Sequence, residues 1–145
     1  MVVGGTGVKI FGVNEVVKAL TKYNRDLNNA NNFAVGRAAL LYESEVKQSI
    51  SGRSSEKRSV DTGRFLSSVT SSKMNASSWR VASDVEYANY LEYGSRTTGP
   101  ARNHFRNSIK RARPKINKLF AEALKKAGIK FNKAGLSSIQ LIKSF

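Results

Sequence analysis

Apolar side chains spaced three and four residues apart between Val16 and Ile50 are the feature that most constrains the fold of this chain. This spacing places them on one face of an amphipathic α-helix. Asn14 suits the N-cap, and Glu15 suits the first turn, where an acidic side chain complements the helix dipole. The pattern therefore predicts one long helix ending at Ile50. Weak helix formers near its middle allow a bend; they are Asn28, Asn29, Asn31, Asn32 and Gly36.

Strand patterns occur on both sides of this helix. Val8–Gly12 predicts a short strand before it, and residues 51–63 are polar and small, which predicts a mobile loop after it. The Ser, Thr and Val content of Phe65–Met74 favours a partly exposed strand. Apolar and polar residues alternate over Trp79–Glu86, as in a strand with one buried face. The two runs predict an antiparallel hairpin with its turn at residues 75–78.

Two further helical patterns follow the predicted hairpin. Residues 87–93 predict a short helix ended by Gly94, and residues 95–100 predict a loop. A helical pattern then runs from Phe105 to Gly128, with a kink or restart expected at Pro114 because proline lacks the N–H that a helix interior needs. The expected fold is α+β, with a long N-terminal helix and a C-terminal helix packed on a small antiparallel sheet. Residues 1–128 form the expected single domain, and 129–145 form an apolar tail suited to packing on a neighbouring subunit.

Positive charge dominates the composition. Lys and Arg number 25 against 10 Asp and Glu, a formal net charge of +15, and residues 102–133 carry 11 basic side chains against the single acid Glu122. A solvated helix face usually mixes both signs, so this asymmetry favours a polyanion or an acidic protein surface as partner. The predicted basic surface comprises Arg53, Lys57, Arg58, Arg96, Arg102, Arg106, Lys110, Arg113 and Lys118.

The sequence lacks the residue sets that most enzymes need. It has no cysteine and only one histidine, His104, so it offers neither a thiolate or paired-histidine metal site nor a Ser-His-Asp set with a spare base. The Gly-rich start has no GxxxxGK[ST] context. We therefore expect no enzyme, cofactor, metal or small-molecule ligand. No apolar run approaches the ~20 residues that cross a bilayer, and no signal peptide is visible, so we expect an intracellular protein without a membrane partner.

Three segments carry the most specific signal. They are Asp61–Val69 (DTGRFLSSV), Tyr87–Ser95 (YANYLEYGS) and Pro100–Phe105 (PARNHF). In this order and spacing they resemble the head–tail connector proteins of long-tailed bacteriophages, also called neck or tail-completion proteins. That family has TGRLxxSI-like, YAxYxExGT-like and PARPF-like segments. This chain departs from the family at Ser95, where a threonine is usual, and at Asn103, where a second proline is usual.

The resemblance implies a structural virion protein that assembles in the host cytoplasm as a ring subunit at the head–tail junction. Its partners would be other copies of itself and other connector and tail proteins. Whether it also makes non-specific contact with packaged DNA stays open. The loop at 51–63 would order against a neighbour or face the DNA channel. The expected inter-subunit surface comprises Tyr87, Tyr90, Tyr93 and Phe105, although these tyrosines are equally compatible with the core of a short helix. Gly63, Gly94 and Pro100 have structural roles at turns.

Two other functions stay open on the residues alone. The basic segment at 102–133 is also compatible with a free nucleic-acid-binding protein, whose affinity for duplex DNA would fall steeply as salt rises. A third hypothesis is a small basic RNA-cleaving toxin, which predicts that expression of the protein arrests cell growth.

Overall fold

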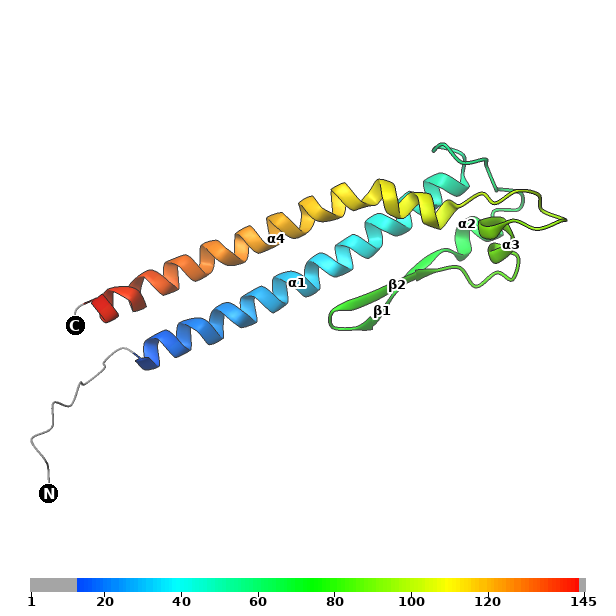
Figure 1. Ribbon diagram of the computed structural model, residues 1–145. Coiled ribbons are helices and arrows are strands. Elements are labelled where there is room, and N and C mark those ends of the chain that lie inside the picture. Colours follow the sequence, from blue (N-terminus) through cyan, green and yellow to red (C-terminus); the bar gives the residue numbers. More distant parts are fainter. Residues whose placement is uncertain (1–12, 144–145) are drawn as a thin grey trace, which may run out of the picture. The chain divides into compact units, whose positions relative to one another are not determined.

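The computed structural model describes the backbone of residues 13–143 and the side chains of residues 14–128. The predicted strand at Val8–Gly12 lies outside the described residues. Six elements follow in the order α1, α2, β1, β2, α3, α4 (Figure 1). The chain divides into two compact units, of which one joins Met1–Ala30 to Ala123–Phe145 and the other is Asn31–Glu122. Helix α1 and a two-stranded antiparallel sheet confirm the predicted α+β class.

Helix α1 spans Val13–Ile50 and begins one residue before the predicted N-cap Asn14. It continues without interruption through the asparagine-rich middle. Gly36 has a packing role there, because a Cβ built on it would lie 3.2 Å from Cζ2 of Trp79. The missing side chain lets the indole of the hairpin lie directly against the helix, which offsets the low helix propensity of glycine.

The predicted strand at Phe65–Met74 is half wrong. Arg64–Ser68 form the short helix α2, and only Thr70–Asn75 form β1. Phe65 is buried in the core from α2, so burial of its ring on helical backbone outweighs the β propensity of the run. Strand β2 spans Ser78–Ala82 and ends before Ser83, four residues earlier than predicted. The strands are antiparallel, with Ser71 opposite Val81 and a register shift between Lys73 and Asn75.

The short helix α3 spans Ala88–Tyr93 and ends at Gly94, as predicted. Helix α4 spans His104–Lys143. It does not restart at Pro114, and Gly128 lies inside it, so the predicted helix end at Gly128 is wrong. A glycine inside a helix is unfavourable by only about 1 kcal/mol, whereas a C-terminal cap also needs a left-handed residue, and Gly128 is not among the residues with positive φ.

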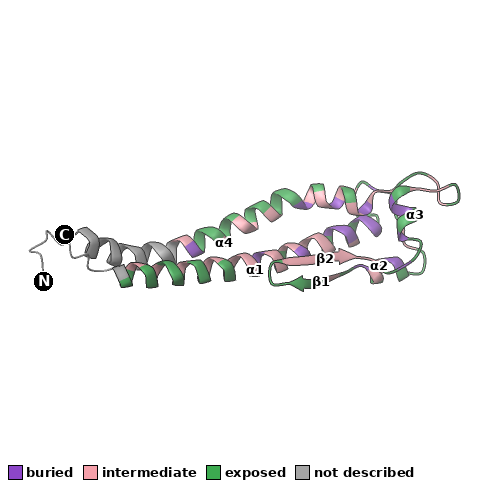
Figure 2. Ribbon diagram, turned by 60° about the horizontal axis from the view of Figure 1, so that its bottom comes forward, coloured by how far each residue is buried: buried purple, intermediate pink, exposed green. Residues whose placement is uncertain are grey.

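One hydrophobic core organises the unit Asn31–Glu122. Its buried members come from α1, α2, α3 and the segments that join them; they are Val46, Ile50, Phe65, Val69, Val85, Ala88 and Leu91. Figure 2 shows these buried positions on α1, α2 and α3, with more at the start of α4. Tyr42 and Phe105 pack against this core as a T-shaped pair with ring centroids 6.4 Å apart. Helix α1, the hairpin and the start of α4 are therefore held by shared apolar contacts.

The unit Met1–Ala30 with Ala123–Phe145 contains the first turns of α1 and the last turns of α4. Ala127 is buried in it, whereas Val17, Leu20 and Leu124 are about half exposed. Across the part of the chain that is described, no helix has an apolar stretch long enough for a bilayer.

Candidate interaction site

The three tyrosines of the predicted surface, here called the tyrosine row, are exposed on and immediately before α3. Tyr87 is 38 % exposed, Tyr90 56 % and Tyr93 78 %. Tyr87 also makes a T-shaped contact with the core ring of Phe65, with centroids 6.1 Å apart. The fourth predicted member, Phe105, is half-buried and packs on the core. Tyr90 and Tyr93 are thus available to a partner, and Tyr87 and Phe105 also support the fold; the role of all four in an interface stays a prediction.

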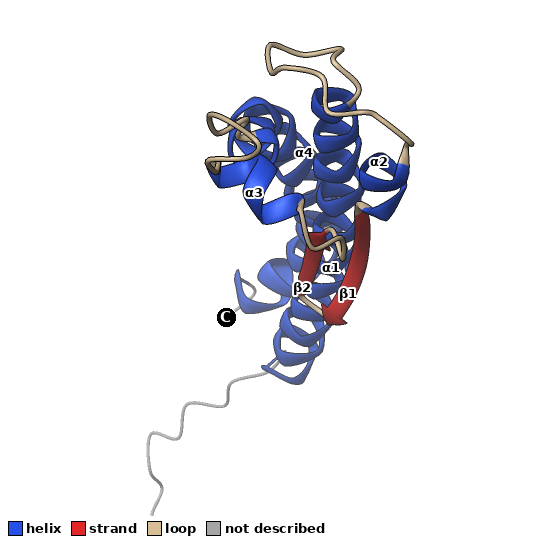
Figure 3. Cartoon of the chain, turned by 90° about the vertical axis from the view of Figure 1, so that its right-hand side faces the viewer, coloured by secondary structure: helices blue, strands red, loops and turns tan. Residues whose placement is uncertain are grey.

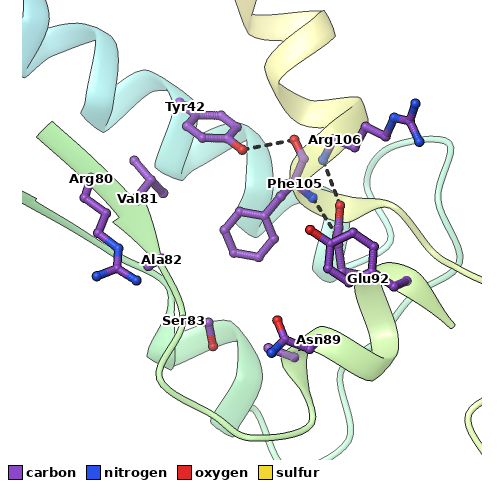
Figure 4. A pocket seen from close by; sticks show the side chains of 11 residues that line it. Tyr42, Arg80, Val81, Ala82, Ser83, Asn89, Glu92, Phe105 and Arg106 are labelled. Atoms are coloured by element: carbon purple, nitrogen blue, oxygen red, sulfur yellow. Dashed lines mark hydrogen bonds between the residues drawn. The ribbon is translucent and has the colours of Figure 1, made fainter. Parts of the chain in front are cut away.

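A pocket of about 660 Å³ lies between β2, α3 and the start of α4 (Figure 4). Val81, Ala82 and Ser83 line one side, and Glu92 and Phe105 lie across from them. Tyr42 also lines the pocket, and its phenol donates a hydrogen bond to the Phe105 carbonyl at 3.1 Å. Burial, reinforced by the charge of Glu92, raises the pKa of Tyr42 to about 12. The Tyr42 hydroxyl therefore stays a neutral donor.

Cationic side chains line this pocket. Arg80 and Arg106 are exposed and belong to its lining. The acid of the lining, Glu92, is 8 % exposed and accepts hydrogen bonds from the backbone N–H groups of Phe105 at 3.0 Å and Arg106 at 2.9 Å. Its carboxylate thus satisfies the free N–H groups of the first turn of α4 and complements the helix dipole. The Glu of the YxExG-like segment is a helix cap, and the pocket presents two arginines to solvent.

The predicted basic surface is mostly exposed, with one exception. Arg102 is half-buried, and its guanidinium Nη1 donates to the Ser59 hydroxyl at 2.6 Å and to the Arg58 carbonyl at 3.1 Å. Arg102 therefore hydrogen-bonds to the loop at 51–63, and its guanidinium is only partly available to bind a phosphate. The other predicted members are exposed; they are Arg53, Lys57, Arg58, Arg96, Arg106, Lys110, Arg113 and Lys118.

Two further basic residues of the 102–133 segment pair with buried acids. Nη1 of Arg111 lies 2.6 Å from Oε1 of Glu56, and Lys115 pairs with Glu45, which is 6 % exposed. Nε of Arg111 lies 3.7 Å from Oε2 of Glu45 and has no hydrogen bond among the described residues. Arg111 and Lys115 therefore neutralise buried carboxylates. The 11 basic residues against one acid in segment 102–133 thus overstate the positive charge that this segment offers to a partner.

A buried polar network around His104 was not predicted. Its imidazole is 0 % exposed and lies between two serines, with Nδ1 2.7 Å from the Ser49 hydroxyl and Nε2 2.6 Å from the Ser59 hydroxyl. Ser49 in turn donates to Oε2 of Glu56 at 2.7 Å. The network joins α1, the loop at 51–63 and α4. Through Glu56 and Ser59, the loop at 51–63 thus hydrogen-bonds to α1 and to α4. The mobility of this loop stays a prediction.

The direction of these hydrogen bonds follows from the charge of Glu56. Burial would raise the pKa of this carboxyl, but hydrogen bonds from Arg111 and Ser49 lower it to about 2. Since Glu56 is ionised, Ser49 gives its one hydrogen to Glu56 and accepts from Nδ1–H of His104. Nε2 is then the acceptor for the Ser59 hydroxyl. Burial also lowers the pKa of His104 below its usual 6.5, against the opposing charges of Glu92 and Glu56. His104 is thus a neutral structural residue and is closed to substrate.

Backbone geometry explains the glycines of the motifs and one departure from the family pattern. Gly63 and Gly94 have φ of 79° and 81°. A Cβ on Gly94 would lie 2.7 Å from the Ala101 nitrogen, whereas Gly63 has no atom within 4 Å. Asn103 has φ of 52°, a left-handed conformation that asparagine tolerates and that proline, fixed near −65°, cannot adopt. Pro100 lies in the exposed turn that follows Gly99.

The ionisable side chains of the described residues are either engaged in ion pairs or hydrogen bonds or at least partly exposed to solvent. Among the described residues, no three His, Asp or Glu side chains gather as metal ligands. The buried acids are paired or cap backbone N–H groups. What the chain offers to solvent is an aromatic row on α3, a pocket with arginines at its lining, and exposed lysines and arginines on the loop and α4. Sequence reasoning missed Glu92 and His104; the signal available was their place within the second and third motifs.

No curated protein and no solved structure matches the chain significantly. A family model does match, over residues 14–94, which is more than half of the 145 residues. The family is described as "Bacteriophage HK97-gp10, putative tail-component". The match covers α1 from residue 14, the hairpin and α3, and so includes the first motif, the second motif as far as Gly94 and the tyrosine row. The chain therefore belongs to the HK97-gp10-like family of bacteriophage tail components.

Proposed function

We propose that this tail component acts at the head–tail junction, as a ring subunit that completes the tail or stabilises its joint with the capsid. The carrying observation is the exposed row Tyr87, Tyr90 and Tyr93 within the region that the family model matches. Tyrosines contribute large contact areas with a polar tip, and they are enriched in protein interfaces. Tyr90 and Tyr93 leave more than half of their surface exposed, so they can take part in an interface without loss of the contact that Tyr87 makes with Phe65.

A ring requires two different complementary surfaces on each subunit, because its interface is heterologous. The tyrosine row is one candidate. The second is the exposed basic face of α4, with Arg106, Lys110 and Arg113, which fits acidic neighbours or packaged DNA. The segment at 129–145 is proposed to pack on a neighbouring subunit, as the apolar residues in its sequence suggest.

Light scattering of the purified protein, with negative-stain microscopy, tests assembly. We expect a closed oligomer. Tyr93→Ser should dissociate it at least partly, because Tyr93 is the most exposed of the three tyrosines and its ring would contribute the largest contact area. Met74→Ser is the matched control, since Met74 is 62 % exposed but lies on β1. A monomer at every concentration, in the presence of the other connector proteins as well, contradicts the proposal.

A free nucleic-acid-binding function is the second candidate, favoured by the eight exposed members of the predicted basic surface. It predicts tight binding to duplex DNA whose affinity falls steeply with salt, at a slope set by the number of phosphate contacts. The connector function predicts weak and non-specific binding at physiological salt. A salt-titrated binding assay with duplex DNA separates the two. The DNA-binding function predicts tight binding that Arg113→Glu/Lys118→Glu weakens, with a shallower salt dependence, whereas the connector function predicts weak binding with or without that variant.

A further inference from the structure

Strand β2 has an unpaired edge. Its one partner among the described elements is β1. The backbone N–H of Ser71 donates to Oε2 of Glu43 at 2.9 Å, so it points out of the hairpin and not toward β2. In an antiparallel ladder, a residue whose N–H points away from the partner strand forms a non-hydrogen-bonded pair with the residue opposite it. Val81, opposite Ser71, therefore also directs its N–H and C=O outward, at the other edge of the hairpin.

The two edges differ in what covers them. Glu43 of α1 takes the outward N–H of β1 at Ser71, through both the backbone and the hydroxyl, which lies at 2.6 Å. For the outward backbone groups of Val81, the described part of the chain provides no hydrogen-bond partner. An unpaired strand edge is a template for a further strand. The edge of β1 is thus capped at Ser71, and that of β2 is open at Val81.

The open edge of β2 lines the pocket that Figure 4 shows. In Figure 3 the hairpin lies with β2 on the side of α3, and residues of both elements line this pocket. Val81 and Phe105 offer apolar surface, and Tyr93 is 78 % exposed at the same site. A strand edge facing a helix across a pocket is the arrangement by which an extended peptide is recognised: main-chain bonds give affinity, and side-chain pockets give specificity.

Charge identifies the kind of peptide. Arg80 and Arg106 are exposed in the lining, and both oxygens of Glu92 are occupied by backbone N–H groups. A second copy is disfavoured as occupant of this pocket because the chain has only 10 acidic side chains against 25 basic ones from which to supply an acidic segment. We propose that the β2 edge takes an extended segment of another virion protein, with an apolar side chain directed at Phe105 and acidic side chains directed at Arg80 and Arg106.

The test presents a displayed library of random short peptides to the immobilised full chain. We expect the selected peptides to alternate apolar and acidic residues. In NMR spectra of the complex, the amide signals of the bound peptide should show that it forms a new strand beside Val81. Val81→Pro, which removes the outward N–H, is expected to abolish binding. Lys73→Pro is the matched control: Lys73 pairs with Trp79 in the same class of pair as Ser71 and Val81, but its outward N–H lies on the β1 edge. It should leave binding unchanged.

A second variant keeps the test decisive if Val81→Pro does not fold. Arg80→Glu/Arg106→Glu changes only exposed side chains and is expected to weaken the selected peptides at least about tenfold, as loss of charge complementarity requires. Selected peptides that are basic, or no selection at all, would overturn the proposal. So would Val81→Pro changing the mass of an oligomer, since the edge would then be filled by a second copy. The proposed ring is scored separately, by the mass of the unvaried protein.

Discussion

The hydroxyl of Ser49 lies 2.7 Å from Nδ1 of His104, and both side chains are fully buried. This contact joins α1 to the first residue of α4 through polar atoms in a region otherwise packed by apolar side chains. Low dielectric strengthens such a network when every member is satisfied and makes it costly to disrupt.

Replacing His104 is therefore expected to destabilise the unit Asn31–Glu122 strongly. His104→Ala leaves the hydroxyls of Ser49 and Ser59 without a shared partner and opens a cavity, which together cost about 3 kcal/mol. Urea unfolding followed by circular dichroism measures the loss. Lys110→Ala, an exposed change on the same helix, should shift stability by no more than about 0.5 kcal/mol. Equal effects of the two variants would contradict the structural role of the network.

Acid should destabilise the fold in two separate steps. The folded pKa of His104 lies below 6.5, so the unfolded chain binds more protons and stability is lost as pH falls below about 6.5. The folded pKa of Glu56 is about 2, so its contribution is lost between 4.5 and about 2. The charged groups facing His104 are Glu56 from the loop, Glu92 from α3, and Arg102 and Arg111 before and on α4.

Urea midpoints measured from about pH 8 to about pH 5 test the first step. The unvaried protein should lose stability across this range, and His104→Gln should be flatter because glutamine does not titrate. An imidazole signal that titrates above 6.5 in the folded protein would refute the assignment of a buried, neutral His104.

Gly94 and Gly63 give a matched pair of substitutions. Both have positive φ, so alanine is strained at each by about 1 kcal/mol. At Gly94 the new Cβ would also lie 2.7 Å from the Ala101 nitrogen, so Gly94→Ala should cost about 3 kcal/mol. Thermal unfolding of the two variants measures the difference. Similar losses would show that the turn after α3 relaxes around the added methyl group.

Gly36 offers a direct optical test of the hairpin's position. Gly36→Leu should displace the indole of Trp79, since even a Cβ at this position lies 3.2 Å from it. Trp79 is the only tryptophan of the chain, so its fluorescence should shift to the red. Gly128→Ala is the control: it meets open space inside α4 and should stabilise by up to about 1 kcal/mol without a spectral change.

The sequence predicted the long helices because their apolar periods extend over many residues, and it predicted the second strand of the hairpin because apolar and polar residues alternate there. It mispredicted Arg64–Ser68, where five residues are too few to separate a helix from a strand by period. It also ended α4 too early, because glycine is a helix terminator only when the backbone turns left-handed.

The candidate site divides in the same way. The sequence left open whether Tyr90 and Tyr93 are exposed or lie in the core, because a helix of six residues is too short for its period to separate the two. The inward direction of Arg102, and the pairing of Arg111 and Lys115 with buried acids, depend on partners 43, 55 and 70 residues away in sequence. The capped edge of β1 likewise depends on Glu43, which no local pattern connects to the hairpin.

The most direct test of the account is an electron-microscopy reconstruction of the virion with this chain located in its density. We expect a ring of copies at the head–tail junction, with the tyrosine row in an interface. A particle that lacks the chain, or that carries it away from the junction, would contradict the central claim.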